Sequence, residues 1–120
     1  MTAIMTEKIE QIVRDLRPYQ PEKVILFGSY AWGKPKKDSD IDLFIIKNTS
    51  KPRHRRTDDV YNLIYKKAYF TGEKFPGPVD IVVYTPQEIR ERLKLGDFFI
   101  KEIFEKGKVL MERLPRHIGK

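Results

Sequence analysis

The sequence contains no cysteine, and this absence excludes two kinds of protein architecture. A chain without thiols can form neither a disulfide framework nor a thiolate metal site. The chain also lacks an apolar run long enough to span a membrane, and its first ten residues lack the apolar core of a signal peptide. We therefore expect a cytoplasmic protein that does not bind a membrane.

Histidine is also scarce, which bears on the reactions that the chain could catalyse. The two histidines, His54 and His117, lie in basic polar segments, and we expect both to be solvated. Ser29 has no evident acid–histidine partner and does not sit in a Gly-x-Ser-x-Gly elbow. A hydrolase that uses Ser29 as its nucleophile is therefore not expected.

Acidic residues are outnumbered, with 17 Asp plus Glu against 24 Lys plus Arg and a net charge of +7. Long-range attraction favours nucleotides or nucleic acid as partners of such a chain. At 120 residues we expect one domain, residues 1–120, with a core from about 10 to 112 and a basic tail at 113–120. This length is short for a catalytic unit with its own substrate domain, so we expect whatever the protein modifies to come largely from elsewhere.

Hydrophobic periodicity predicts that helices and strands alternate along the chain. Apolar residues at helical spacing predict helices over residues 4–17, from 29, over about 57–69, over 85–93 and over 97–106. Apolar, β-rich runs predict strands over 24–27, 41–46, 79–84 and 109–111. The fold class is therefore α/β (α+β), a small mixed sheet flanked by helices.

Three further expectations concern the surface of this fold. Asp58 and Asp59 are placed in the first turn of their helix, where negative charge is favourable. The basic run at 51–56 is most simply a charged loop, although contact with a triphosphate, an RNA or a protein is left open. We expect five aromatic residues to be core more often than interface, with an oligomer or partner surface left open: Tyr61, Tyr65, Tyr69, Phe98 and Phe99.

The stretch 24–46 carries the residues that indicate chemistry. The first strand stops at Gly28, and Ser29 can cap the helix that follows, so that backbone N–H groups point outward at a place for a phosphate. Side chains two apart in a strand share a face, so Asp40 and Asp42 project together and could share a divalent cation. The two features together predict a site for a metal-bound nucleoside triphosphate.

A third aspartate, Asp80, opens the strand predicted at 79–84. An unpaired carboxylate in an otherwise buried strand loses its hydration and needs a partner. A metal ion is one candidate for that partner.

The spacing Gly28-Ser29, ten residues, Asp40, one residue, Asp42 resembles the signature of the nucleotidyltransferase superfamily that includes DNA polymerase beta. The sequence resembles the smallest members of this superfamily, the minimal nucleotidyltransferases, over roughly residues 10–112. It implies the polymerase beta-like fold, with ATP or another nucleoside triphosphate as substrate. It also implies two Mg²⁺ ions held by Asp40 and Asp42, with Asp80 completing the ion nearer the attacking hydroxyl.

The resemblance also implies nucleotide contacts by Gly28, Ser29 and Lys37. In one respect the sequence departs from the family, because many relatives carry an arginine where this chain has Trp32. The indole cannot neutralise a phosphate, so either a lysine of the loop at 34–37 replaces the arginine or the indole stacks on a base.

The function implied by the resemblance is transfer of AMP from ATP to a hydroxyl group of a macromolecule. Relatives of this size are similar to antitoxins whose partner is a toxin of the HEPN class (higher eukaryote and prokaryote nucleotide-binding), and the acceptor is a tyrosine of that toxin. Two alternatives stay open: a non-catalytic antitoxin that acts by direct contact, and nucleotidyl transfer to a small molecule or an RNA end. A homo- or hetero-oligomer is also left open.

Overall fold

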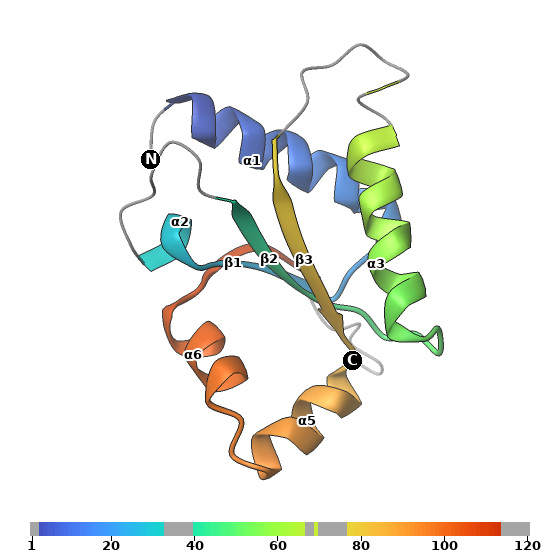
Figure 1. Cartoon of the computed structure of the whole chain (residues 1–120), viewed down its shortest axis with the longest axis vertical. Helices are drawn as coiled ribbons and strands as arrows, with labels where there is room; N and C mark the ends of the chain where they lie inside the picture. The colour runs from blue at the N-terminus through green and yellow to red at the C-terminus, as the bar shows by residue number, and fades with distance from the viewer. Residues whose placement is uncertain (1–2, 33–39, 67–68, 70–76, 114–120) are drawn as a thin grey trace, which may run out of the picture.

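The computed structural model describes residues 3–32, 40–66, 69 and 77–113, with side chains from Glu7 onward (Figure 1). Its elements follow the alternation that the sequence predicts. They are α1 (Ala3–Leu16), the 3-10 turn η1 (Arg17–Tyr19), β1 (Lys23–Phe27), α2 (Ser29–Trp32), β2 (Ile41–Ile46), α3 (Arg53–Tyr61), the π-helical turn η2 (Asn62–Lys66), β3 (Val79–Tyr84), α5 (Pro86–Lys94), α6 (Phe98–Lys106) and β4 (Lys108–Glu112). None of the helices in these ranges is long and apolar enough to cross a membrane.

The strands form one mixed sheet in the order β3-β2-β1-β4. β1 pairs antiparallel with both β2 and β4, whereas β2 and β3 run parallel. A parallel pair needs a crossover, and α3 with η2 provides it. The predicted class, a small mixed sheet flanked by helices, is confirmed.

Alternating residues of the strands supply two hydrophobic cores, one on each face of the sheet. On one face α1 and α3 cover residues such as Leu26, Leu43 and Ile81. On the other face, called the α6 face below, α5 and α6 cover Ile25 and Phe44. Figure 1 shows α1 and α3 on one side of the sheet and α5 and α6 on the other.

The outer edge of β3 is satisfied by side chains of the crossover. The Tyr65 hydroxyl accepts a hydrogen bond from Val79 N at 2.9 Å and donates one to Gly77 O at 2.9 Å. One residue before the end of the strand, Arg56 Nη1 donates to Val83 O at 3.3 Å. These bonds occupy backbone groups that an edge strand would otherwise expose, and they fix the strand that carries Asp80.

The helix boundaries on the α6 face follow from local capping. Thr85 and Glu88 form a capping box, in which Glu88 N donates to Thr85 Oγ1 at 3.1 Å and Thr85 N donates to Glu88 Oε1 at 2.9 Å. Asp97 caps α6 by accepting a hydrogen bond from Ile100 N at 3.2 Å. Both helix starts agree with the sequence prediction.

Two expectations about helical surfaces are wrong. α3 begins at Arg53, because Pro52 O accepts the first backbone hydrogen bonds of the helix, so Asp58 and Asp59 do not lie in its first turn. Asp59 instead pairs with Lys51 Nζ at 2.8 Å. Tyr69, Phe98 and Phe99 are not core residues, since they are 83%, 80% and 45% exposed.

Candidate active site

Gly28 forms a tight turn between β1 and α2. Its φ of +77° lies in the left-handed region that disfavours a side chain. A Cβ at this position would also collide with the Asp42 carboxylate, which lies against the Gly28 backbone. Glycine is therefore required here twice, by its conformation and by the close approach of Asp42.

The structure corrects the expected capping role of Ser29. Gly28 O accepts hydrogen bonds from Ala31 N at 3.0 Å and Trp32 N at 3.1 Å, so Gly28 holds the capping position and Ser29 is the first helical residue. The half-buried Ser29 hydroxyl makes no hydrogen bond with any residue that the structure describes. It is therefore available to a ligand.

The three aspartates come from neighbouring segments of the sheet. Asp42 on β2 stands beside Phe27 at the end of β1 and beside Asp80 on β3. Their neighbours Leu43 and Ile81 belong to the core under α1 and α3, so Asp42 and Asp80 project toward the α6 face. Asp40 is exposed and directly precedes β2. The register therefore places Asp42 beside Asp80 at one end of the sheet, and Asp40 directly precedes the strand that carries Asp42. That the three carboxylates act as site residues stays a prediction.

The electrostatics of this end are those of a like-charge cluster. Burial raises the pKa of the Asp42 carboxyl, and the charges of Asp80 and Asp40 raise that pKa further. Within the described ranges, none of the three carboxylates forms an ion pair or a hydrogen bond. The cluster therefore gathers negative charge that no neighbouring cation in those ranges neutralises.

A metal ion at this cluster would need ligands from elsewhere. Across the part of the chain that the structure describes, no three acidic or histidine side chains are arranged to hold a metal ion by themselves. Magnesium commonly takes one or two protein carboxylates together with waters and the phosphates of a substrate. The carboxylates therefore fit a metal that arrives with a nucleotide better than a permanent metal centre.

Two tyrosines that the sequence analysis did not assign to the site lie close enough to feel its charge. The rings of Tyr61 and Tyr65 stack with centroids 5.8 Å apart. Burial raises the pKa of both hydroxyls, and the charges of Asp80 and Asp40 add to that effect. Their spacing of four residues on one helix face is the signal that could have indicated the pair.

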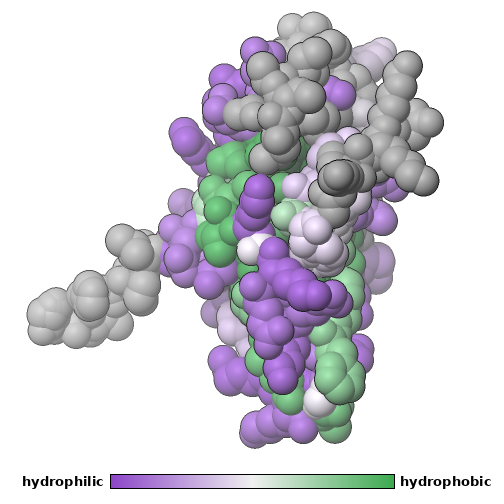
Figure 2. Space-filling view, turned by 90° about the vertical axis from the view of Figure 1, so that its left-hand side faces the viewer, coloured by the Kyte–Doolittle hydropathy of each residue, from purple (hydrophilic) through white to green (hydrophobic). Residues whose placement is uncertain are grey.

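Aromatic rings extend from the site toward the surface. Phe27, which faces Asp42 across the strand pair, contacts Trp32 with centroids 6.3 Å apart and Phe99 with centroids 5.6 Å apart. Trp32 is 41% exposed and Phe99 45% exposed, and we call these three residues the aromatic cluster. Figure 2, which views the side of Figure 1 where α2 and α6 lie, shows apolar surface interrupted by hydrophilic side chains.

Lys37, the remaining predicted nucleotide contact, lies outside the described residues, as do Lys34 and Lys36. Their contribution stays a prediction. The structure places Trp32, the residue that departs from the family pattern, against the Phe27 ring.

The sheet order, the glycine turn after β1 and the aspartates that begin β2 and β3 define the class of fold, that of the polymerase beta-like nucleotidyltransferases. The sequence matches the family model described as "Nucleotidyltransferase domain" over residues 6–110. The chain therefore belongs to this family, and the resemblance inferred from the sequence is confirmed.

Two solved structures are similar to the chain. One, titled "Crystal structure of the toxin-antitoxin with AMP-PNP", is 23% identical with a TM-score of 0.56, and the match covers 88% of this chain and 73% of that one. The other, a mutant of the toxin-antitoxin MntA-HpeT, is 18% identical with a TM-score of 0.47 and the same coverage. The first likeness supports the fold. A comparison with curated proteins finds no match.

Proposed function

We propose that the protein is a Mg²⁺-dependent nucleotidyltransferase that transfers AMP from ATP to a hydroxyl group of a macromolecular acceptor. The observation that carries the proposal is the position of Asp42. Its carboxylate lies against the Gly28 turn, and its register partner on the neighbouring strand is Asp80. At Asp42 a glycine turn that leaves room for a phosphate lies beside carboxylates that attract the cations of that phosphate. A nucleoside triphosphate with its metal needs both features.

The chain's own residues have distinct tasks in this reaction. Gly28 leaves room for the triphosphate, and the Ser29 hydroxyl donates a hydrogen bond to its β- or γ-phosphate. The acceptor oxygen forms a bond to the α-phosphorus, the bond from that phosphorus to the bridging oxygen breaks, and pyrophosphate leaves. Asp80, which is exposed, accepts the proton of the acceptor hydroxyl.

The carboxylates fit a pair of Mg²⁺ ions by their chemistry. Asp40 and Asp42 would hold both ions, and Asp80 would complete the ion nearer the acceptor. When bound, such ions supply charge stabilisation at the attacking and departing oxygens. Cations would also relieve the mutual repulsion that raises the pKa of Asp42.

A toxin of the HEPN class is the proposed acceptor, with one of its tyrosines receiving the AMP. The fold is shared with a protein of a toxin–antitoxin complex that was crystallised with AMP-PNP. The aromatic cluster beside the carboxylates is partly exposed, which suits a site that a protein surface approaches.

The proposal is tested by incubating the protein with ATP labelled in the α-phosphate, Mg²⁺ and the toxin encoded nearest to it. Label on the toxin supports the proposal, and Asp42→Asn should remove it. The matched control is Asp58→Asn, which neutralises an exposed aspartate of α3 far from the turn. Tight binding to the toxin without label, unchanged in Asp42→Asn, would instead identify an antitoxin that acts by contact alone.

A further inference from the structure

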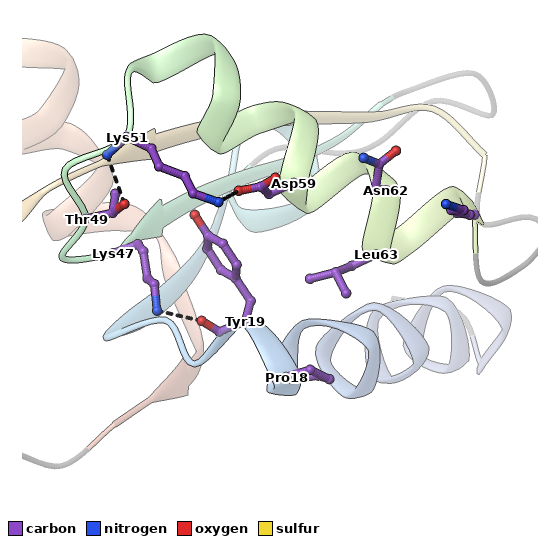
Figure 3. Close-up of a pocket in the computed structure, with 9 residues that line it drawn as sticks. Pro18, Tyr19, Lys47, Thr49, Lys51, Asp59, Asn62 and Leu63 are labelled. Carbon is purple, nitrogen blue, oxygen red and sulfur yellow. Dashed lines mark hydrogen bonds and ion pairs between the residues drawn. The ribbon is translucent and has the colours of Figure 1, made fainter.

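A pocket of about 520 Å³ lies at the other end of β2 from the carboxylates (Figure 3). Asp42 and Lys47 are separated by five residues, which at about 3.3 Å per residue is about 16 Å of strand. The pocket also opens on the opposite face of the sheet, where η1 meets α3 and η2. Its lining residues are Pro18, Tyr19, Lys47, Thr49, Lys51, Asp59, Asn62, Leu63 and Lys66.

One lysine of the pocket is held in place by backbone oxygens. Lys47 Nζ donates hydrogen bonds to Tyr19 O at 2.7 Å and to Gln20 O at 3.3 Å, and it lies 5.0 Å from the centre of the Tyr19 ring. An ammonium has three N–H donors, so one remains for a ligand. Lys47 is therefore a pre-positioned cation.

The backbone that holds Lys47 is itself unusual. Gln20 has a φ of +54°, and among the described residues it is the one non-glycine residue with a positive φ. A left-handed residue of this kind costs free energy and is worth a functional explanation. The turn at Gln20 directs two carbonyl groups to Lys47.

The charges around the pocket are unequal, with three lysines facing one carboxylate. Lys51 Nζ forms an ion pair with the Asp59 carboxylate at 2.8 Å, so the charges of these two residues neutralise each other. Lys66 forms no ion pair or hydrogen bond with any residue in the described ranges. Lys47 and Lys66 therefore leave the pocket with an excess of positive charge.

The remaining lining suits the organic part of an anion. Figure 3 shows the Tyr19 ring between Lys47 and Lys51, with Leu63 and Pro18 beside it. These apolar surfaces can receive a ring, while Thr49 and Asn62 offer hydrogen bonds. The volume lies within the range of about 300–1,000 Å³ that is usual for small-molecule sites.

We propose that this pocket binds a phosphate ester attached to a ring, of the size of a nucleoside monophosphate. Lys47 and Lys66 contact the phosphate, and the Tyr19 and Leu63 wall contacts the ring. A free nucleotide and the terminal nucleotide of an RNA present the same chemistry. The proposal does not depend on the transfer reaction, because the pocket shares no residue with the carboxylate end.

The test is an NMR titration of the Asp42→Asn protein without Mg²⁺, which removes the metal-dependent part of nucleotide binding at the carboxylate end. The probes are AMP, ribose 5-phosphate and the dinucleotide ApA. We expect saturable shifts of the Thr49 and Asn62 amides with AMP, and weaker binding of ribose 5-phosphate because it lacks the base. Tighter binding of ApA than of AMP would identify an RNA as the ligand. Tighter binding of AMP would identify a free nucleotide.

Lys66→Gln should weaken AMP binding by about tenfold, or about 1.4 kcal/mol, because the variant loses a charge-assisted hydrogen bond to the phosphate. Lys101→Gln is the matched control, because it removes the same charge from an exposed position on α6. Tyr19→Leu should weaken AMP more than ribose 5-phosphate. Unshifted pocket amides at millimolar AMP, or equal weakening by Lys66→Gln and Lys101→Gln, would overturn the proposal whether or not the protein transfers AMP.

Discussion

The charged side chains at the two ends of β2 are arranged differently. At its start, Asp40, Asp42 and Asp80 gather negative charge, and none of them pairs with a cation in the described ranges. Beyond its end, Arg56 is buried and fully engaged: it donates to Glu88 Oε1 at 2.7 Å, to Glu88 Oε2 at 3.3 Å and to Lys51 O at 2.7 Å. Like charges collect at the start of β2, whereas beyond its end the charges of Arg56 and Glu88 neutralise each other.

For this reason the pKa of a carboxyl group is shifted in opposite directions at the two ends. Burial would raise the pKa of Glu88, but hydrogen bonds from Arg56 and from the Thr85 N–H outweigh it and lower that pKa. Burial raises the pKa of Asp42, and its two acidic neighbours raise it further. A carboxylate that pairs with an arginine stabilises the fold. A carboxylate surrounded by other carboxylates destabilises the fold until a cation binds to them.

The largest expected effect is that of Asp42→Asn on transfer. The change keeps the side-chain volume and removes the charge that would hold the metal, so transfer should fall by at least about a hundredfold. Because the charged form of Asp42 is disfavoured in the fold, stability at neutral pH should not decrease. Labelled-ATP transfer and urea unfolding measure the two quantities. Full activity in this variant would contradict the metal assignment.

At the opposite end, Arg56→Met should lower stability without affecting the chemistry. It removes the hydrogen bonds that Arg56 donates to Glu88 and to the Val83 carbonyl, and breaking such a buried pair costs about 3 kcal/mol. Arg53→Met is the matched control: Arg53 lies 3.9 Å from Glu88 and is half exposed, so its loss should cost less than about 1 kcal/mol. Urea midpoints compare the two variants. Equal losses would show that the buried pair has no special role.

Gly28→Ala should affect both stability and transfer. The left-handed φ costs about 1–2 kcal/mol for a residue with a Cβ, and the new methyl group displaces the Asp42 carboxylate. Gly96→Ala is the control, because Gly96 has a φ of +80° and no neighbour where its Cβ would stand. We expect similar losses of stability in the two variants but a loss of transfer only in Gly28→Ala. Unchanged transfer would show that the position of Asp42 is unimportant.

A smaller effect is expected for Ser29→Ala. Loss of one hydrogen bond to a charged phosphate should weaken the binding of a non-hydrolysable ATP analogue by about 1.5 kcal/mol. Calorimetry measures the dissociation constant, and Ser50→Ala, an exposed serine beyond the other end of β2, should leave it unchanged. Equal dissociation constants for Ser29→Ala and the unaltered protein would remove the serine from the phosphate site.

The carboxylate end could be predicted from the sequence because its information is local. The bounds of β2 follow from an apolar run, and the period of two in a strand is the reason for expecting Asp40 and Asp42 on the same side, although Asp40 directly precedes the strand. The spacing from Gly28 then joins β1 to β2. Only the pairing of Asp42 with Asp80 needed the sheet, and there the family resemblance supplied the expectation.

The basic end could not be predicted, because distant contacts shape it. α3 begins with Arg53-His54-Arg55-Arg56, which has no apolar period to mark a helix. Arg56 is fixed by Glu88, thirty-two residues away. The pocket likewise joins Tyr19, Lys47 and Asn62 from three separate segments. No local pattern relates these residues, so the sequence predicted only a charged loop at 51–56.

The smallest effect, and the one that compares the two ends directly, is the pH dependence of stability. Glu88 has a lowered pKa in the fold, so its contribution is present above the unfolded value of about 4.3 and is lost as the pH falls through the folded value. Asp42 has a raised pKa, so its destabilising effect is present at neutral pH and disappears as the pH falls through that raised value.

Asp42→Asn should therefore be more stable than the unaltered protein at pH 7 but not at pH 3. Glu88→Gln should be less stable at pH 7, with the difference shrinking toward pH 3. Urea unfolding at both pH values measures these differences, and if the two variants shifted stability in the same direction at pH 7, the two ends of β2 would not be electrostatic opposites.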